Sequence, residues 1–478
     1  MTAILGAGMS GLSAGFYLLK QRHPSAVTIY EASNRIGGWI RSERFDDDGF
    51  IFEGGPRTMR TKGPAAINSL NLIDELGLAD QVRPIHSNHV AARNRMVYAK
   101  GKLNMLPSDV FGLIKVIPPF TKPLFFAGIK DLFTGRSKPQ LEDETIYEFT
   151  RRRFGKEIAD YAIGAMICGI CAGDAKQISV KFLLKHLFEL EQKYGGVFIG
   201  LLKESMSARK KKTLVGEDSL TNLANRAKNE HWSIYSLNGG LQQLPDKVGS
   251  ILSQKQVDIQ INVNCKEILF DSKKVHLLMN GQEKTVDHLI SAIPSHQLAK
   301  CVAKQHPNLS KGLDAIPFVD VAVINLRYNS PKLQKHEGFG FLVPPIENLP
   351  ILGVIFDSCC FDMKQNTVLT VMMGGAWFHQ WFGDNPSEEQ LLDTALKHVN
   401  NILKIDQTPN HYKVNILRKC IPQYVFGHHK RVEKIKQYIR ENNLPIALCG
   451  ASYDGVGVND VILSAKTCVE TLFNKESG

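Results

Sequence analysis

The chain has 478 residues, which is enough for two or three domains with full hydrophobic cores. Its hydrophobic content of 43% and charged content of 22% are ordinary for a globular protein. The formal net charge of +11 suits an acidic substrate or an anionic surface, and because no RNA- or DNA-binding motif accompanies it, we expect no nucleic-acid partner.

The first expected element is a short buried strand over residues 3–5, which leads into the sequence GAGMSG at residues 6–11. A G-x-G-x-x-G motif between a strand and a helix is typical of a turn that binds the pyrophosphate of a dinucleotide. Apolar residues at helical spacing predict a helix over residues 9–21. A second strand, expected over residues 27–30, ends at Glu31, where a carboxylate would accept hydrogen bonds from an adenosine ribose. At this point NAD and FAD both remain possible.

A second pair of glycines, Gly37 and Gly38, follows, with Arg35 before it and Trp39 after it. A single nicotinamide site does not need this pair. The combination resembles the extended fingerprint of the FAD family that contains amine oxidases, phytoene desaturases and protoporphyrinogen oxidases. The sequence FEGGPR at residues 52–57 continues the resemblance. The resemblance therefore implies FAD as the cofactor, bound non-covalently, one per subunit.

Residues 110–133 combine many large apolar side chains with Lys115, Lys122 and Lys130. No run of about 18 apolar residues occurs in the chain, so we expect no membrane-spanning helix. Apolar bulk with interleaved lysines is typical of a segment that lies on a bilayer surface, although the same segment would also suit the wall of a substrate channel. The prolines in its middle predict two short helices or a broken ridge rather than one helix.

Two basic runs, at residues 151–153 and 209–212, are interpreted as exposed faces, and residues 205–219 as a solvated loop. The nine cysteines are odd in number and scattered, which argues against a disulfide framework. Cys168 and Cys171 have the spacing of half a zinc site, but no second half accompanies them, so we assign no metal. Cys359 and Cys360 are expected in a strand, as packing residues.

The remaining pattern predicts the domain order. A turn at residues 239–241 leads to an expected helix and a strand over 257–263, and another strand is expected over 286–294. Strands over 319–328, 353–357 and 368–373 predict a mixed sheet. A strand over 445–449 precedes the glycine-rich sequence GASYDGVGVND at 450–460 and a helix. Near a flavin, such a turn stabilises negative charge around N1 and C2=O.

The expected fold class is α/β (α+β overall). It comprises a discontinuous Rossmann-like FAD-binding domain, a mixed-sheet substrate domain and a helical membrane-associated domain. The FAD-binding domain is expected over residues 1–88, 231–300 and 413–478, the helical region over 89–230 and the mixed sheet over 301–412.

Several sequences spread along the chain resemble the mitochondrial type of protoporphyrinogen oxidase: GGWIRS at 37–42, GPR at 55–57, NR at 94–95, CIPQY at 420–424 and GASYDGV at 450–456. The resemblance implies a step of heme biosynthesis, the six-electron oxidation of protoporphyrinogen IX to protoporphyrin IX, with O2 as oxidant and H2O2 as product. No side chain is assigned as acid or base, because the family chemistry implies hydride transfer to flavin N5. An amine oxidase, or a non-enzymatic protein like the GDP-dissociation inhibitors, is the alternative.

The resemblance also implies two sets of site residues. The cofactor set is Gly6, Ala7, Gly8, Met9, Ser10, Gly11, Glu31, Gly38, Trp39, Gly55, Pro56, Arg57, Thr58, Cys265, Ala451, Val456, Gly457 and Val458. The substrate set is Arg95, which would bind a propionate, with Phe339, Leu342, Ile355 and Met372, each of which would otherwise be read as core. The family further implies a homodimer bound monotopically to the mitochondrial inner membrane, on its intermembrane-space side, without a cleavable presequence.

Overall fold

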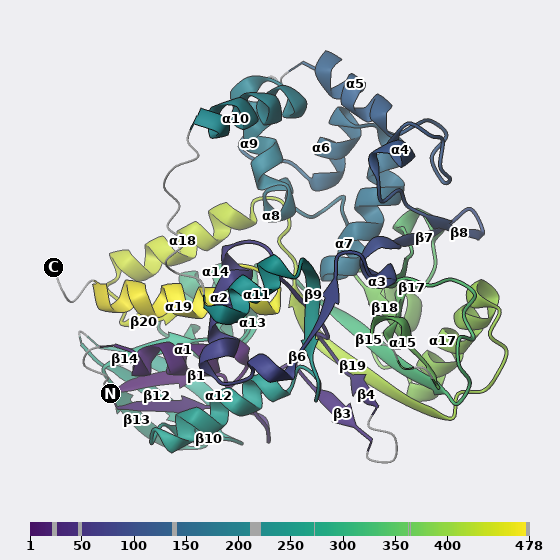
Figure 1. Cartoon of the computed structure of the whole chain (residues 1–478). Helices are drawn as coiled ribbons and strands as arrows, with labels where there is room; N and C mark the ends of the chain where they lie inside the picture. Colours follow the sequence, from purple (N-terminus) through teal and green to yellow (C-terminus); the bar gives the residue numbers. More distant parts are fainter. Residues whose placement is uncertain are drawn as a thin grey trace. The chain divides into compact units, whose positions relative to one another are not determined.

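The computed structural model describes residues 1–21, 26–45, 50–135, 141–210, 221–271, 273–361, 363 and 365–474. The chain divides into two compact units, each assembled from separate stretches of sequence. Unit 1 comprises Met1–His86, Leu220–Pro317 and His429–Gly478, and unit 2 comprises Ser87–Ser219 and Phe318–His428. The colours of Figure 1 show this mixing, since purple, teal and yellow segments lie together in unit 1.

A five-stranded parallel sheet forms the centre of unit 1, in the order β10-β2-β1-β14-β20. Its central strand, β1, is buried along its whole length, which explains why the N-terminal sequence is a continuous apolar run rather than an alternating one. The strands come from three distant stretches of the chain. They are β1 (Thr2–Leu5), β2 (Val27–Tyr30), β10 (Asp258–Gln260), β14 (His288–Ser291) and β20 (Ile446–Leu448).

Helices α1 (Met9–Leu19), α2 (Pro64–Glu75), α12 (Gln243–Gln254) and α19 (Val458–Asn474) pack on one another beside this sheet. Their apolar residues share one core with the sheet. Gly15 of α1 permits the close packing, because a Cβ there would lie 3.0 Å from the side chain of Ile29 and 3.3 Å from that of Leu252. The helices expected after the first strand and at the C-terminus are thus confirmed.

The rest of unit 1 surrounds this core with smaller sheets and helices. The small sheets pair β3 with β4, β5 and β6 with β9, and β11 and β13 with β12. Their strands are β3 (Ser42–Arg44), β4 (Ile51–Glu53), β5 (Met59–Arg60), β6 (Val82–His86), β9 (Trp232–Leu237), β11 (Cys265–Phe270), β12 (Val275–Met279) and β13 (Gln282–Val286). The further helices are α11 (Asn222–Asn229), α13 (Ser295–Val302), α14 (Pro307–Asp314) and α18 (His428–Glu441).

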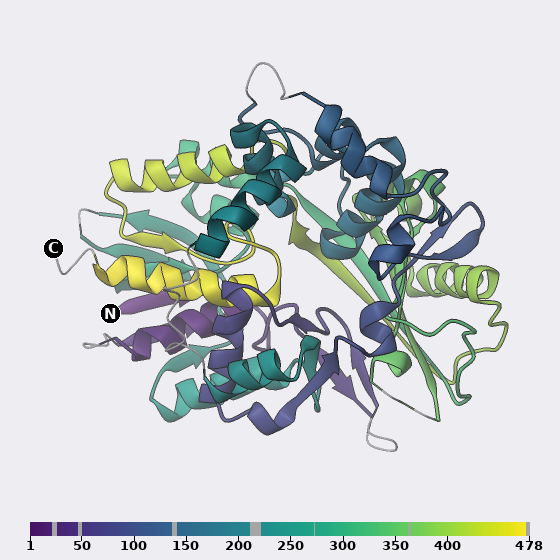
Figure 2. The same ribbon diagram turned by 45° about the horizontal axis from the view of Figure 1, so that its top comes forward.

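Unit 2 is built on a seven-stranded mixed sheet in the order β19-β15-β18-β17-β16-β7-β8. Its neighbours pair antiparallel except for β16 and β7, which are parallel. The strands are β7 (Met96–Ala99), β8 (Lys102–Met105), β15 (Phe318–Tyr328), β16 (Gly340–Leu342), β17 (Ile351–Phe356), β18 (Thr367–Gly375) and β19 (His411–Pro422). Helix α17 (Glu388–Leu403) packs on this sheet, as Figure 2 shows in green, and its apolar residues join the core on that face.

The expected domain boundaries differ from the two units at three places. Residues 221–230 were expected in the helical region, but they belong to unit 1, where they include α11. Residues 413–422 were expected in the FAD-binding domain, but they lie in β19, which pairs antiparallel with β15 at the edge of the seven-stranded sheet. Residues 301–317 were expected in the substrate domain, but they belong to unit 1, where α14 packs against α13. In addition, the helices expected as a region of their own belong to the same unit as the mixed sheet. Strand pairing between residues far apart in sequence decides these boundaries.

Two local expectations are also wrong. Cys359 and Cys360 end a short helix, α15 (Asp357–Cys360), because the chain turns at the end of β17 instead of continuing as a strand. Residues 205–210, expected in a loop, continue helix α10 (Val197–Lys210), and the remainder of that expected loop lies outside the described residues.

The basic run at residues 151–153 is exposed only at its first member. Arg153 is completely buried, where its guanidinium pairs with Asp131 at 3.2 Å and with Glu191 at 2.7 Å. Arg152 pairs with Glu191 at 2.8 Å and with Glu144. Burial raises the pKa of Glu191, but the hydrogen bonds from both arginines outweigh burial and leave the pKa lowered. An arginine is normally exposed, but here the paired carboxylates offset the free-energy cost of burying its charge.

This ionic cluster joins three of the helices in unit 2. Asp131 lies on α5 (Phe125–Phe133), Arg153 ends α6 (Ile146–Arg153) and Glu191 lies on α9 (Lys185–Tyr194). The second oxygen of Asp131 accepts a hydrogen bond of 2.9 Å from the backbone N–H of Phe198 at the start of α10. The neighbouring helical segments of unit 2 are α3 (Val90–Arg93), α4 (Val110–Leu113), η2 (Ile158–Ile163), α7 (Gly164–Cys171), α8 (Val180–Leu183) and α16 (Phe378–Phe382).

We expect Arg153→Ala to destabilise the helices of unit 2 by about 3–5 kcal/mol, because it removes the ion-pair partner of the buried Asp131 carboxylate and leaves Glu191 paired with Arg152 alone. Arg151→Ala is the matched control, since Arg151 forms only an exposed pair with Glu148 and should change stability by less than about 1 kcal/mol. Urea unfolding and hydrogen exchange in α5 and α9 measure both effects. Equal losses in the two variants would contradict the prediction.

Candidate functional site

The glycine-rich turn at residues 6–11 brings helix α1 directly onto strand β1. Gly6 has φ of +95°, a conformation that glycine adopts without strain. A Cβ on Gly11 would lie 1.8 Å from the carbonyl oxygen of Gly6, so only glycine fits there. Helix α1 begins after Gly8, and no side chain caps its N-terminus. The first N–H groups of the helix are therefore available to an anion.

The carboxylate of Glu31 lies beside this turn, at the end of β2. It accepts hydrogen bonds from the backbone N–H of Ala7 at 2.7 Å and of Ser33 at 2.9 Å. The backbone N–H of Val263 donates to the carbonyl of Glu31 at 2.8 Å, and Cys265 follows two residues later at the start of β11. The structure thus brings Glu31 and Cys265 to the same side of the turn, as expected of a ribose and adenine site.

The second glycine pair packs against the first. The backbone N–H of Gly37 donates to the carbonyl of Ala7 at 2.8 Å, and a Cβ on Gly38 would lie 3.1 Å from the Cα of Gly8. The Arg35 guanidinium holds this loop by donating to the carbonyls of residues 36, 38 and 40. This role of Arg35 was not predicted, although its place directly before the glycines was an available signal.

The loop around residue 55 is joined to the second glycine pair. A Cβ on Gly55 would lie 2.1 Å from the carbonyl oxygen of Trp39, so the two backbones touch. Trp39 itself is 43% exposed, whereas Arg57 is buried and Pro56 and Thr58 are half-buried. Sequence reasoning missed Glu53, which accepts hydrogen bonds from the backbone N–H of Leu241 and from Ser42, and so ties this loop to the turn at 239–241.

The C-terminal glycine-rich turn meets the first turn of α1. A Cβ on Gly450 would lie 2.9 Å from the Ser10 hydroxyl oxygen. The Asn459 amide, one residue into α19, donates to the carbonyl of Arg60 at 3.0 Å. The predicted residues of this turn, Ala451, Val456, Gly457 and Val458, are all half-buried.

Polar side chains hold the C-terminal turn in shape. Ser464 accepts a hydrogen bond from the backbone N–H of Gly450 at 2.9 Å and donates one to Asp454 at 2.6 Å. Asp460 accepts from the backbone N–H of Gly457 at 3.1 Å, and burial raises the pKa of the Asp460 carboxyl. None of these three roles was predicted, because each depends on how the turn folds against α19, which a single sequence does not reveal.

All eighteen residues of the predicted cofactor set lie in unit 1. The contacts above connect the turns at 6–11, 37–39, 55–58 and 450–458 into one backbone-lined cradle. Uncapped helix N–H groups, glycines that leave no room for a Cβ and a carboxylate at the strand end are the features that a dinucleotide requires. The residues therefore fit FAD, and the role of each one stays a prediction.

The predicted substrate residues all lie in unit 2. Arg95 is exposed between α3 and β7, and within the described residues its guanidinium has no hydrogen-bond or ion-pair partner. Phe339 lies nearby, because its backbone N–H donates to the carbonyl of Asn94 at 3.3 Å.

The other three residues of the substrate set share one face of the mixed sheet. Leu342 and Met372 both pair with Gly353, and Ile355 lies two residues further along the same strand. Each of the three is half-buried, whereas the opposite face is filled by the core under α17. Leu342 and Met372 also pack near α7, so both contribute to the core as well.

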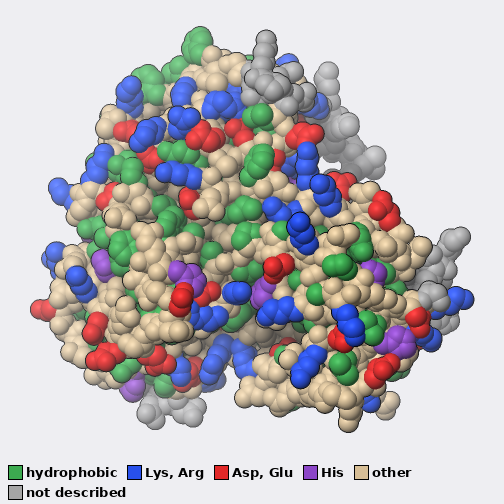
Figure 3. Space-filling model, turned by 180° about the vertical axis from the view of Figure 1, so that it is seen from behind, with side chains coloured by type: hydrophobic (Ala, Val, Ile, Leu, Met, Phe, Trp, Pro, Cys, Tyr) green, Lys and Arg blue, Asp and Glu red, His purple; other side chains and the backbone are tan. Residues whose placement is uncertain are grey.

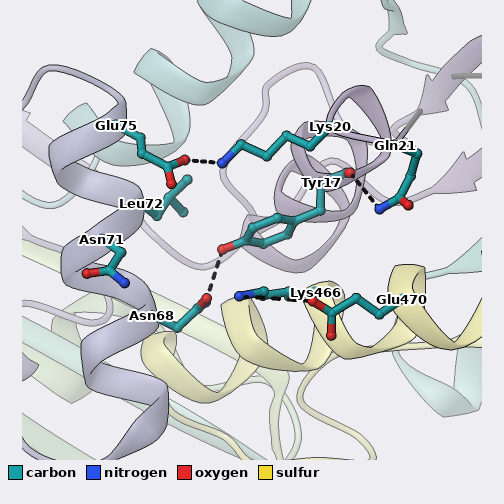
Figure 4. A pocket seen from close by; sticks show the side chains of 9 residues that line it. All are labelled: Tyr17, Lys20, Gln21, Asn68, Asn71, Leu72, Glu75, Lys466 and Glu470. Atoms are coloured by element: carbon teal, nitrogen blue, oxygen red, sulfur yellow. Dashed lines mark hydrogen bonds and ion pairs between the residues drawn. The ribbon is translucent and has the colours of Figure 1, made fainter. Parts of the chain in front are cut away.

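A polar pocket of about 270 Å³ lies apart from the cradle, among α1, α2 and α19 (Figure 4). The Tyr17 hydroxyl accepts a hydrogen bond from Asn68 at 3.0 Å, and burial raises the pKa of Tyr17 to about 12. Lys20 pairs with Glu75, and Lys466 with Glu470. These charges satisfy one another, so we assign the pocket no function.

Comparisons with known proteins agree with the cradle. The family described as flavin containing amine oxidoreductase matches residues 9–472. Curated relatives include the protoporphyrinogen oxidases of Bos taurus, 38% identical, and Homo sapiens, 35% identical, each over 99% of this chain and 98% of the relative.

Solved structures show the same fold. A putative protoporphyrinogen oxidase from Exiguobacterium sp. 255-15 has a TM-score of 0.79 at 22% identity and covers 99% of this chain and 98% of its own. Cyclohexylamine oxidase from Brevibacterium oxydans has a TM-score of 0.69 at 14% identity, over 100% of this chain and 99% of its own. The chain therefore belongs to the flavin-containing amine oxidoreductase family and is an FAD-dependent oxidoreductase.

Proposed function

We propose that the chain oxidises protoporphyrinogen IX to protoporphyrin IX, with O2 as electron acceptor. The observation that carries this proposal is the similarity, over almost the full length of both chains, to curated relatives named protoporphyrinogen oxidase. Likeness to amine oxidases of known structure, at 14–16% identity, supports the shared fold only. Protoporphyrinogen is therefore favoured over an amine as the substrate.

The cradle of unit 1 holds the cofactor through its backbone. The N–H groups at the start of α1 bind the pyrophosphate, and Glu31 accepts hydrogen bonds from the ribose. The N-terminus of α19, with the turn at 450–458, places positive backbone dipoles where negative charge develops on the flavin ring. FAD held there would supply two-electron oxidation, used three times per substrate, with one O2 reduced to H2O2 each time.

Unit 2 supplies the groups that recognise the substrate. The unpaired guanidinium of Arg95 binds a propionate carboxylate through two parallel hydrogen bonds. The half-buried apolar face with Leu342, Ile355 and Met372 contacts the tetrapyrrole. No acid or base is needed among these residues, since their task is to orient an electron-rich substrate.

We also infer that unit 2 lies on a membrane surface through α4, α5 and α10. These helices expose an apolar patch, which we call the interfacial surface: Phe111, Ile114, Phe126, Ile129, Leu132, Phe133, Leu201, Leu202 and Met206. Helices α5 and α10 pack closely, because a Cβ on Gly128 would lie 3.0 Å from the Phe198 ring. Hydrophobic and basic side chains gather together at the top of the molecule in Figure 3.

The segment 110–133 forms two short helices, as predicted, and α10 extends its apolar patch. In the part of the chain that the structure describes, no helix is both long and apolar enough to cross a membrane. Placement on the mitochondrial inner membrane, facing the intermembrane space, and a homodimer complete the proposal. They are supported by the resemblance described above.

We expect Gly11→Ala to weaken FAD binding at least about tenfold, or about 1.4 kcal/mol, because its Cβ would displace α1 from Gly6. Gly135→Ala is the control, since nothing lies within 4 Å of a Cβ there. Glu31→Gln keeps the shape of the site and should lower FAD affinity without unfolding. Flavin absorbance relative to protein measures all three, and full FAD content in the Gly11 and Glu31 variants would refute the assigned cradle.

We expect Arg95→Ala to raise the KM for protoporphyrinogen about 10- to 100-fold with a smaller change in kcat, since a charge-assisted hydrogen bond contributes about 1.5–3 kcal/mol. Arg95→Lys should recover part of the loss. Arg93→Ala, exposed two residues away, is the control. Porphyrin fluorescence above the autoxidation background reports the rate. If wild-type protein gives no rate above that background, the proposed function is wrong.

We expect Phe133→Asp to reduce binding to phosphatidylcholine vesicles that contain phosphatidylserine by about tenfold or more, since a buried phenyl side chain contributes about 1.5–3 kcal/mol. Phe133 is 86% exposed on the interfacial surface. Tyr412→Asp, at an exposed residue of β19, should leave binding unchanged. Vesicle co-sedimentation compares them, and an equal effect of both variants would exclude this surface as the docking site.

A further inference from the structure

Two cysteine thiols of unit 1 face each other beside the cradle. Cys265 begins β11, and Cys301 lies in the last turn of α13, which packs on β11. The Cys301 thiol donates to the carbonyl oxygen of Cys265 at 3.2 Å, and the Cys265 thiol donates to the carbonyl oxygen of Glu267 at 3.6 Å. Both cysteines are free, with no disulfide between them.

The surroundings of this pair favour reaction with a small oxidant. Cys265 is partly exposed, whereas Cys301 is 5% exposed. The neighbouring Cys265 side chain lowers the pKa of Cys301, burial opposes this, and the neighbouring Lys300 adds to the lowering. The Cys301 side chain and burial raise the pKa of Cys265. One thiol of the pair is therefore the better nucleophile and the other the better proton donor.

We propose that Cys265 and Cys301 form a redox-modification site at which H2O2 converts the two thiols into a disulfide. The inference rests on the proposed function, which supplies H2O2 at the same protein. The Cys301 thiolate attacks one peroxide oxygen, the O–O bond breaks, and after proton uptake one water leaves and a sulfenic acid remains. The Cys265 sulfur then displaces the sulfenic oxygen, and a second water leaves. Two thiols and one H2O2 thus give one disulfide and two waters.

The disulfide acts on the cofactor cradle through a short segment of backbone. Residues 262 and 263 donate hydrogen bonds to the carbonyls of Ser33 and Glu31, at 2.9 Å and 2.8 Å. A disulfide bond requires the sulfurs to approach to about 2.05 Å. The start of β11 must move toward α13 to allow this, and the segment that contacts Glu31 moves with it. Oxidation therefore weakens FAD binding.

A second pair of cysteines in the same unit provides a matched control. Cys449, after β20, and Cys468, on α19, also lie beside each other, and they are 1% and 8% exposed. Neither thiol of this pair is as exposed as Cys265. If access selects the reactive pair, peroxide links Cys265 to Cys301 and leaves Cys449 and Cys468 reduced.

The experiment treats the FAD-loaded protein with increasing H2O2, blocks the remaining thiols and maps the peptides by mass spectrometry. We expect a peptide that links Cys265 to Cys301, none that links Cys449 to Cys468, and reversal by dithiothreitol. The amount of FAD released into the filtrate should rise as the disulfide forms, because the Kd for FAD increases about tenfold, or about 1.4 kcal/mol. Absence of the link while exposed methionines are oxidised, or equal linking of both pairs, would overturn the proposal.

Variants separate the disulfide from general oxidative damage. Cys301→Ser should abolish both the link and the peroxide-induced release of FAD, whereas Cys468→Ser should keep both. Release of FAD from Cys301→Ser as complete as from the wild type would also overturn the proposal. Because the peroxide is added, the test needs no porphyrinogen. If the protein has full oxidase activity but the disulfide does not form, only this inference is wrong. If the disulfide forms in a protein without oxidase activity, only the proposed function is wrong.

Discussion

The contact between Gly11 and the carbonyl of Gly6 is the constraint on which the rest of unit 1 depends. With a Cβ only 1.8 Å from that oxygen, any other residue would push α1 away from β1. Because the helix lies so close, its N-terminus reaches the turn, Ala7 reaches Gly37, and Ser10 reaches Gly450. Each further segment of the cradle is positioned by backbone approach to this first turn. Side chains, among them Glu31, Arg35 and Glu53, then hold these segments in place through hydrogen bonds to the backbone.

Unit 2 is held together by different forces. One face of its sheet is filled by the core under α17, and the other presents half-buried apolar residues near α7. Its helices are joined by a buried ionic cluster around Arg153 rather than by apolar packing alone. Such a cluster is costly to desolvate, so its contribution to net stability is small, but it permits few alternative arrangements of α5, α6 and α9. This restriction holds α5 in one position although its apolar face is exposed to solvent.

The glycine turns could be predicted because their requirement is local. A positive φ or a close backbone approach requires glycine, and the glycines can be read directly from the sequence. The ends of strands and the helix after Gly8 were predictable for the same reason. Arg153 could not be predicted, since a buried arginine looks like any other until Asp131 and Glu191 are placed beside it. The edge position of β19 and the meeting of Cys265 with Cys301 depend on pairing between residues far apart, which one sequence does not encode locally.

The assembly of the parallel sheet from three distant stretches has a consequence for biosynthesis. Gly11 and Gly450 touch the same helix turn, yet the ribosome makes them far apart in time. At about 5–20 residues per second, roughly 20 to 90 s separate their synthesis. Strand β20 and helix α19 complete the sheet only after that interval, so α1 waits with its apolar face uncovered. The cradle is therefore completed only near the end of synthesis.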